Sequence, residues 1–177
     1  LSLAVLNGED ADLRMVKRAI EFINTQPRVL IFAAAGNRVS SRDNEFRGYE
    51  NNVPAPARYE ALQRNQLEGF ENLPDHVRML MGVGAISTEF KELDISLKHS
   101  IPLLNAPGHS ITATDIARPT KWITPTSGTS MATAIATGTA AAIWKHNPNM
   151  RSWEVVEMML TTARPGGLPT FFPYEEH

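Results

Sequence analysis

Two polar positions lie where a parallel α/β sheet places its ligands. Asn37 follows directly on a buried apolar run, and Ser130 stands at the start of a segment rich in small residues. Sheets of this kind bind ligands at the carboxyl ends of their strands and at helix N-termini. These two positions are therefore the first at which to look for chemistry.

Ser130 belongs to Gly128-Thr129-Ser130-Met131-Ala132, which opens a helix. A hydroxyl there is close to backbone N–H groups without intrahelical partners and to the positive end of the helix dipole, and both stabilise an anion. Such a serine could be the nucleophile of an acyl transfer. On these residues alone, an ordinary N-cap role for Thr129 or Ser130 is the favoured interpretation.

Asn37 could donate a hydrogen bond from its side-chain amide to an oxyanion. The group is uncharged and short, and its place just after a buried strand makes it rigid. However, Gly36-Asn37 is also common turn chemistry, because both residues tolerate left-handed backbone angles. The segment by itself leaves both interpretations open.

The elements that position Asn37 form a strand, helix, strand unit. Residues 1–6 indicate a short apolar strand, and Pro27 ends an amphipathic helix. Residues 28–35 are a continuous apolar run, typical of a strand buried on both faces of a parallel sheet. The unit predicts an α/β fold.

Further strands are expected along the rest of the chain, at 77–86, 101–104 and 110–114. The composition of 105–108 predicts a turn between the last two.

Two helices are expected near the end of the chain. The small residues of 129–146 predict a helix that passes close to a sheet and is buried nearly all round. Residues 152–162 predict a last helix with one apolar face.

Composition limits the classes of function. The chain has 177 residues, a formal net charge of −2 and no cysteine. The length allows one domain, and the charge argues against a protein that coats nucleic acid. The absence of cysteine excludes disulfides and thiolate chemistry, and no apolar run approaches the roughly 20 residues of a membrane span.

Four motifs in this order resemble the C-terminal part of the subtilisin-like serine proteases: Ala33-Ala34-Ala35-Gly36-Asn37, Gly82-Val83-Gly84-Ala85, Ala106-Pro107-Gly108 and Gly128-Thr129-Ser130-Met131-Ala132. The resemblance covers about residues 1–163, except for an excursion from regular structure at about 38–76, which we interpret as an insertion relative to the family. It implies a doubly wound, mostly parallel sheet with helices on both faces, whose N-terminal portion is absent, and a tail at 164–177.

The resemblance also implies roles. Ser130 would be the nucleophile, and Asn37 would form the oxyanion hole together with the backbone N–H of Ser130. Substrate-binding positions would be Ser2, Leu3, Ala4, Ala35, Gly36, Arg38 and Thr129. A guanidinium pairs well with a carboxylate, so Arg38 suggests a preference for Asp or Glu before the cleaved bond, unless it simply points to solvent.

The family's triad also needs an aspartate and a histidine, which lie in the N-terminal half of its members. In the family the aspartate stands in an Asp-Ser/Thr-Gly motif and the histidine in a His-Gly-Thr motif. Neither motif occurs in this sequence, and His109 is interpreted as a solvated loop residue. The base could come from a preceding segment or partner chain, the domain could have become a binding module, or a new base could have been recruited. We expect the first, because both Asn37 and Ser130 are retained.

The leading hypothesis is therefore a serine endopeptidase portion acting on peptides or proteins, completed by the N-terminal half of the same protease. The alternative is a catalytically inactive subtilisin-like domain that binds a peptide or protein. A nucleotide-binding domain ranks last, because no phosphate-binding glycine motif occurs. No metal or cofactor site is expected in this chain, although the resemblance allows calcium in the complete protein. The compartment is not assigned by the sequence, and the resemblance favours an extracellular one.

Overall fold

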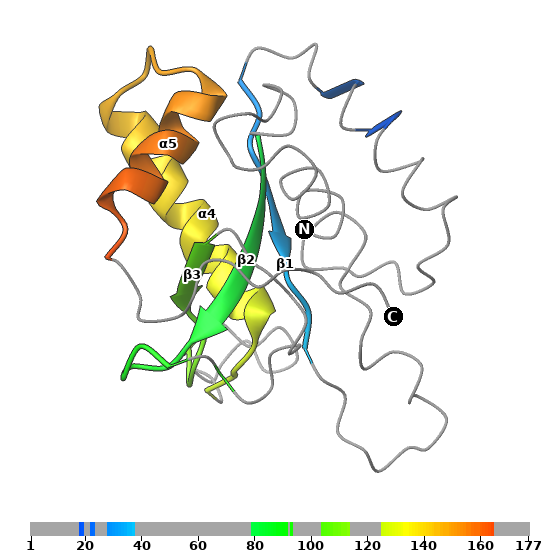
Figure 1. Cartoon of the computed structure of the whole chain (residues 1–177), viewed down its shortest axis with the longest axis vertical. Coiled ribbons are helices and arrows are strands. Elements are labelled where there is room, and N and C mark those ends of the chain that lie inside the picture. Colours follow the sequence, from blue (N-terminus) through cyan, green and yellow to red (C-terminus); the bar gives the residue numbers. More distant parts are fainter. Residues whose placement is uncertain are drawn as a thin grey trace.

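The structure of the chain is a computed structural model, and it describes residues 18–19, 22–23, 28–37, 79–91, 93, 104–113 and 125–164. Within these ranges, three strands form one parallel sheet and two helices follow (Figure 1). The strand expected at 1–6 and the excursion at 38–76 lie outside the described residues, as does the tail beyond Arg164. Of the helix expected before Pro27, the described residues 18–19 and 22–23 are helical.

The sheet has the order β1-β2-β3, with β1 at Ile31–Ala34, β2 at Leu80–Ile86 and β3 at Leu104–Pro107. Both neighbouring pairs are parallel. Because β1 and β2 are almost wholly buried, their residues read as continuous apolar runs. The predicted parallel α/β sheet is confirmed.

The predicted turn at 105–108 is wrong, since its first three residues belong to β3. Asn105 and Ala106 lie in register with Gly84 and Ala85 of β2, so strand pairing outweighs the turn-like composition. The strand expected at 110–114 is also absent among its described residues. Ile111 makes only an isolated antiparallel bridge, because the backbone of Ser110 is left-handed, with φ 51°.

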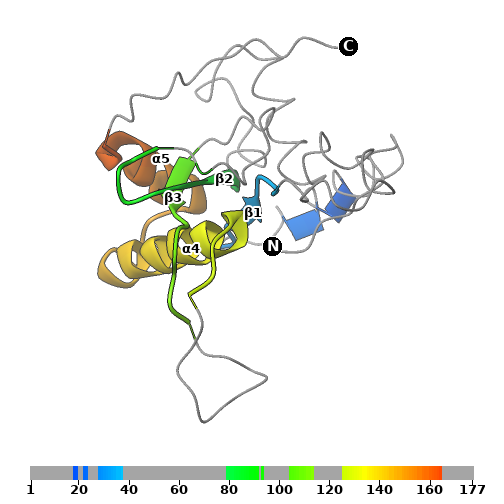
Figure 2. The same cartoon turned by 90° about the horizontal axis from the view of Figure 1, so that it is seen from below.

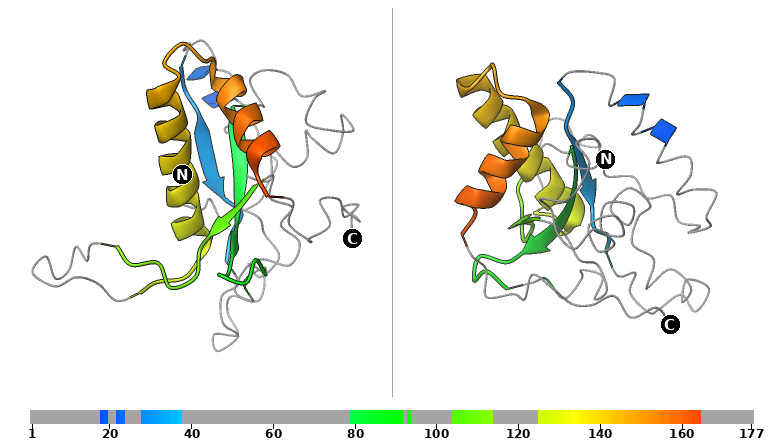
Figure 3. Two further views of the ribbon diagram at one scale, coloured as in Figure 1. Left: turned by 90° about the vertical axis from the view of Figure 1, so that its left-hand side faces the viewer. Right: turned by 45° about the horizontal axis from the view of Figure 1, so that its top comes forward.

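Helix α4, at Thr129–His146, packs against all three strands, and α5, at Ser152–Thr162, packs against α4 (Figures 2 and 3). Both have the predicted bounds. The side chain of Trp144 fixes the turn between them, because its Nε1–H donates to the carbonyl of Met150 at 2.9 Å. The guanidinium of Arg28 lies 5.7 Å from the centroid of the same ring and so links the start of β1 to the end of α4.

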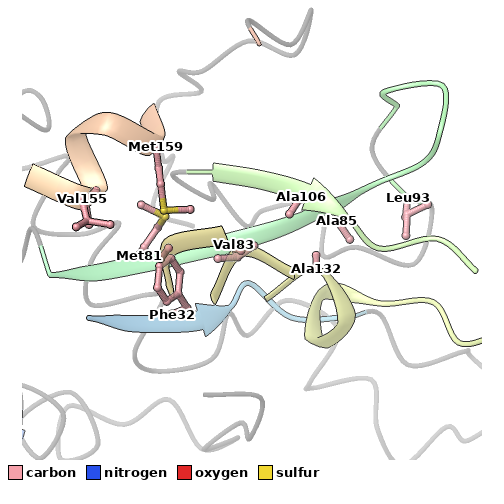
Figure 4. Close-up of a cluster of buried hydrophobic side chains, with 12 residues drawn as sticks. Phe32, Met81, Val83, Ala85, Leu93, Ala106, Ala132, Val155 and Met159 are labelled. Carbon is pink, nitrogen blue, oxygen red and sulfur yellow. The ribbon is translucent and has the colours of Figure 1, made fainter. Parts of the chain in front are cut away.

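The core lies where the strands meet the two helices, and Figure 4 shows its side chains. Met81 and Val83 of β2 and Val155 of α5 are fully buried. The face of α4 toward the sheet carries alanines one turn apart, Ala132, Ala136 and Ala140, each at most 3% exposed. These small side chains let the helix axis approach the strands closely.

The expectation that α4 is buried nearly all round is wrong for the structure as described. Its opposite face is exposed over most of its length, at Ala134, Thr137, Gly138, Thr139, Ala141 and Ala142. The composition correctly predicted a close approach to the sheet, but it cannot show how many sides of the helix are covered.

None of the helices in the described part of the chain is long and apolar enough to span a membrane.

Candidate active site

The end of β1 and the start of α4 meet through a compact hydrogen-bond network. Asn37 Oδ1 accepts from the backbone N–H of Thr129 at 2.9 Å and from its hydroxyl at 3.1 Å. Thr129 Oγ1 in turn accepts from the backbone N–H of Gly36 at 3.2 Å. The residue is only 1% exposed, so its hydroxyl joins the two segments inside the protein.

This network determines how the Asn37 amide is oriented. Both groups that Thr129 presents to the amide donate, and a backbone N–H can only donate, so the atom facing them is the carbonyl oxygen. The two N–H bonds of Nδ2 therefore remain for another acceptor. Asn37 is itself exposed, so this acceptor can come from solvent or from a ligand.

Gly128 makes room for that amide. A Cβ atom on this residue would lie 3.0 Å from Asn37 Nδ2, closer than such atoms normally approach. Its φ of 154° also belongs to a region that side chains rarely adopt. The backbone conformation thus favours glycine here, and a Cβ would force the Asn37 amide to shift by a few tenths of an ångström.

Ser130 is half-buried in the first turn of α4, one residue after Thr129. The N-cap of the helix is Gly128, with no side-chain capping bond, so the ordinary N-cap interpretation of Thr129 or Ser130 is wrong. The carbonyl of Gly128 accepts from Met131 and Ala132, at 3.1 and 3.3 Å. No acceptor among the described residues takes the N–H of Ser130, as expected for the first turn of a helix.

Two unengaged donors therefore lie at the N-terminus of α4: the backbone N–H of Ser130, and Nδ2 of Asn37, whose Oδ1 is bonded to the adjacent Thr129. The first is at the positive end of the α4 dipole. Such donors can stabilise a negative oxygen that forms on a carbonyl during attack by the hydroxyl. The arrangement is thus suited to acyl transfer.

A second polar group lies on the other flank of this loop, after β3. Ser127 Oγ accepts from the backbone N–H of Ser110 at 2.9 Å and lies 3.5 Å from His109 Nδ1. Gly108, just before them, has no room for a side chain, because a Cβ there would lie 2.6 Å from that of Ala85. The predicted exposure of His109 is confirmed.

The other predicted site residues differ in what the structure says of them. Ala35 is buried, and its N–H donates to the Val83 carbonyl at 2.9 Å. Gly36 is half-buried with a left-handed φ of 104°. Ser2, Leu3, Ala4 and Arg38 lie outside the described residues. The substrate-binding roles of all these residues, and of Thr129, stay predictions.

Sequence reasoning missed two features of the site. The first is the bond of Thr129 to Asn37, which gives Thr129 a positioning role beyond the predicted substrate contact. The second is the contact between Ser127 and His109. The sequence did hold a signal for both contacts, because Ser127 and Thr129, which carry hydroxyl groups, flank Gly128. Metal ligands do not gather here, since the described part of the chain holds no cluster of three His, Asp or Glu side chains.

Comparison with known proteins decides the family. The family model described as the subtilase family matches residues 4–173. The chain belongs to the subtilase family. A search of curated proteins found no significant match.

Solved structures of other subtilases share the fold. The prenylagaramide maturation protease PagA has a TM-score of 0.56 at 21% identity, over 93% of this chain and 50% of that one. MycP1 from Mycobacterium smegmatis has a TM-score of 0.54 at 22% identity, over 84% of this chain and 39% of that one. The self-cleaved protease domain of PatA has a TM-score of 0.56 at 22% identity, over 85% of this chain and 48% of that one. This subtilase chain therefore spans half or less of the length of these structures and corresponds to an incomplete subtilisin-like α/β domain.

Proposed function

We propose that this subtilase chain carries the nucleophile and the oxyanion hole of a serine endopeptidase. The observation that supports this most directly is the pair of hydrogen bonds that Thr129 donates to Asn37 Oδ1, at 2.9 and 3.1 Å. It leaves Asn37 Nδ2 free to donate to another group at the N-terminus of α4, where Ser130 follows Thr129.

The chemistry is hydrolysis of a peptide bond through an acyl-enzyme. Ser130 Oγ attacks the carbonyl carbon and gives its proton to a histidine, while the carbonyl oxygen becomes an oxyanion held by Asn37 Nδ2 and the Ser130 N–H. The histidine then protonates the leaving amine as the C–N bond breaks. Water, deprotonated by the same histidine, attacks the ester and releases the acid and Ser130.

The histidine and its aspartate are proposed to come from a complementary half of the protease. No histidine in the described part of the chain forms a hydrogen bond with Ser130. The chain spans half or less of the related structures, and the exposed face of α4 consists of small residues suited to close packing. A complementary half packed on that face would bury α4, and we propose that its catalytic residues extend to Ser130 in the first turn of the helix.

A fluorophosphonate probe tests this proposal on the full-length protein. Such a probe modifies only a serine that a base has activated. We expect mass spectrometry to find one adduct, on Ser130, and the Ser130→Ala variant to remain unlabelled. The Asn37→Ala variant should label more slowly, by the roughly 10²–10³-fold that loss of the oxyanion-hole asparagine costs in subtilisin.

The alternative is a catalytically inactive subtilisin-like domain that binds a peptide or protein. It is favoured by the lack of a base beside Ser130 among the described residues. Full-length protein that folds but takes no probe at Ser130 would contradict hydrolysis and favour this alternative.

A further inference from the structure

The segment after β3 runs beside the segment that leads into α4. The N–H of Gly128 donates to the Gly108 carbonyl at 2.8 Å. Ile111 and Thr126 exchange two backbone hydrogen bonds, at 2.9 and 3.0 Å. These bonds fix the position of His109, which stands between them on the chain, next to the loop of the candidate nucleophile.

The contact with Ser127 orients the imidazole of His109. Ser127 Oγ already accepts from the N–H of Ser110, so its own proton can be donated to His109 Nδ1, 3.5 Å away. A ring that accepts at Nδ1 carries its proton on Nε2. His109 is exposed, and no described residue bonds to Nε2. In this tautomer, with Ser127 donating to Nδ1, the site presents to solvent an N–H donor that the proposed reaction does not use.

Asn37 and His109 stand on opposite flanks of the site. The first follows β1 and the second follows β3, with β2 between them in the sheet. Two strand spacings amount to about 10 Å, which an extended peptide crosses in about three residues. A substrate whose carbonyl oxygen is held at Asn37 thus reaches the β3 flank within about three residues of the bond to be cleaved.

We infer that His109 determines specificity by donating a hydrogen bond from Nε2 to an acceptor side chain of the substrate. The acceptor is the carboxylate of Glu or Asp, within about three residues of the scissile bond on the β3 flank. A carboxylate matches a solvent-facing N–H donor, because charge-assisted hydrogen bonds are stronger than neutral ones. The inference rests on the proposed function, since it assumes a peptide held between Asn37 and His109.

The test compares peptides that differ by a single Glu or Leu at each of the three positions on either side of the scissile bond. kcat/KM is measured for the full-length protein and for its His109→Gln and His109→Asn variants. The Gln amide can place an N–H near the position of Nε2, whereas the shorter Asn reaches only that of Nδ1. Binding of the same peptides is measured in parallel in Ser130→Ala protein, so that peptide selectivity is observed without hydrolysis.

We expect one position at which Glu is preferred over Leu. At that position His109→Asn should lower the preference about 5- to 10-fold, and His109→Gln should retain most of it. The binding series should show the same pattern, including in a protein that fails to hydrolyse, where only the proposed function would be lost. An unchanged preference in His109→Asn would overturn the inference while leaving hydrolysis intact. A loss of kcat that is equal for all peptides would also overturn it, because it would assign His109 to the reaction itself.

Discussion

The backbone N–H and the hydroxyl of Thr129 both donate to Asn37 Oδ1, across 92 residues of sequence. One residue thereby joins the end of β1 to the first turn of α4 and orients the amide of the candidate oxyanion-hole residue. Because the donor pair lies on a buried helix terminus, the amide is oriented before any ligand arrives. Preorganisation of this kind is what makes an oxyanion donor effective.

Replacing Thr129 by valine should lower the rate of acylation. Valine preserves the branched shape but removes the hydroxyl that donates to Asn37 and accepts from Gly36. We expect kcat to fall about 3- to 10-fold with little change in KM, because one of two bonds that orient the amide is lost. Thr129→Ser retains the hydroxyl and should keep most of kcat. A valine variant as fast as the wild type would show that the backbone bond alone orients Asn37.

Gly128→Ala should damage both stability and activity. The new Cβ would meet Asn37 Nδ2 at 3.0 Å, and φ 154° is unfavourable for alanine. We expect a loss of about 1–3 kcal/mol in the free energy of unfolding, measured by urea denaturation, and a fall in kcat of more than tenfold. The activity loss should disappear when Gly128→Ala is introduced into an Asn37→Ala background, because the displaced amide is already gone. Additive losses would mean that the glycine acts on catalysis by another route.

Lowering the pH should destabilise the start of α5, because it protonates Glu154. Its carboxylate accepts from the side chain and the backbone N–H of Arg151, at 3.2 and 2.6 Å, and these bonds hold the pKa of Glu154 below its ordinary value. A lowered pKa in the folded state adds stability that is complete above the ordinary carboxyl pKa of about 4.3 and is lost as the pH falls through the folded value. Glu154→Gln should therefore lose less stability than the wild type between pH 6 and pH 3, measured as urea midpoints. Parallel curves for the two proteins would contradict this account.

Much of the fold follows from the sequence because its elements have strong local signals. The alanine-rich composition and the following Pro148 predicted the bounds of α4. The spacing of apolar residues along one face predicted those of α5. β3 was misplaced because a turn-like composition at Asn105 and Ala106 says nothing of the partner strand. Pairing with β2 is a contact between distant residues, and it decided the conformation.

The sequence predicted which segments meet at the site, but not the hydrogen bonds between them. Asn37 follows the end of a strand and Ser130 lies at the start of a helix, so the topology alone brings them to one edge of the sheet. The hydrogen bonds of Thr129 depend on side-chain rotamers, which no local pattern encodes. Only the left-handed backbone of Gly36 had a local signal, since glycine tolerates that conformation. The exposed face of α4 was equally beyond the sequence, because a small-residue helix fits a covered and an open surface alike.

Gly138 offers a test of what covers that face, through the sign of a single substitution. It lies in the middle of α4, is exposed, and has no atom within 4 Å of the place where a Cβ would stand. On an open helix surface Gly138→Ala should stabilise the protein by about 1 kcal/mol, because alanine is the better helix former. If a complementary half packs closely on α4 in the full-length protein, the added methyl meets it, and we expect the gain to vanish or become a loss in urea denaturation. Ala134→Gly and Ala141→Gly report helix propensity on the same face and should each cost about 1 kcal/mol or more, since they add no atoms. A full gain from Gly138→Ala would show that the face is open at this point and would argue against a complementary half packed there.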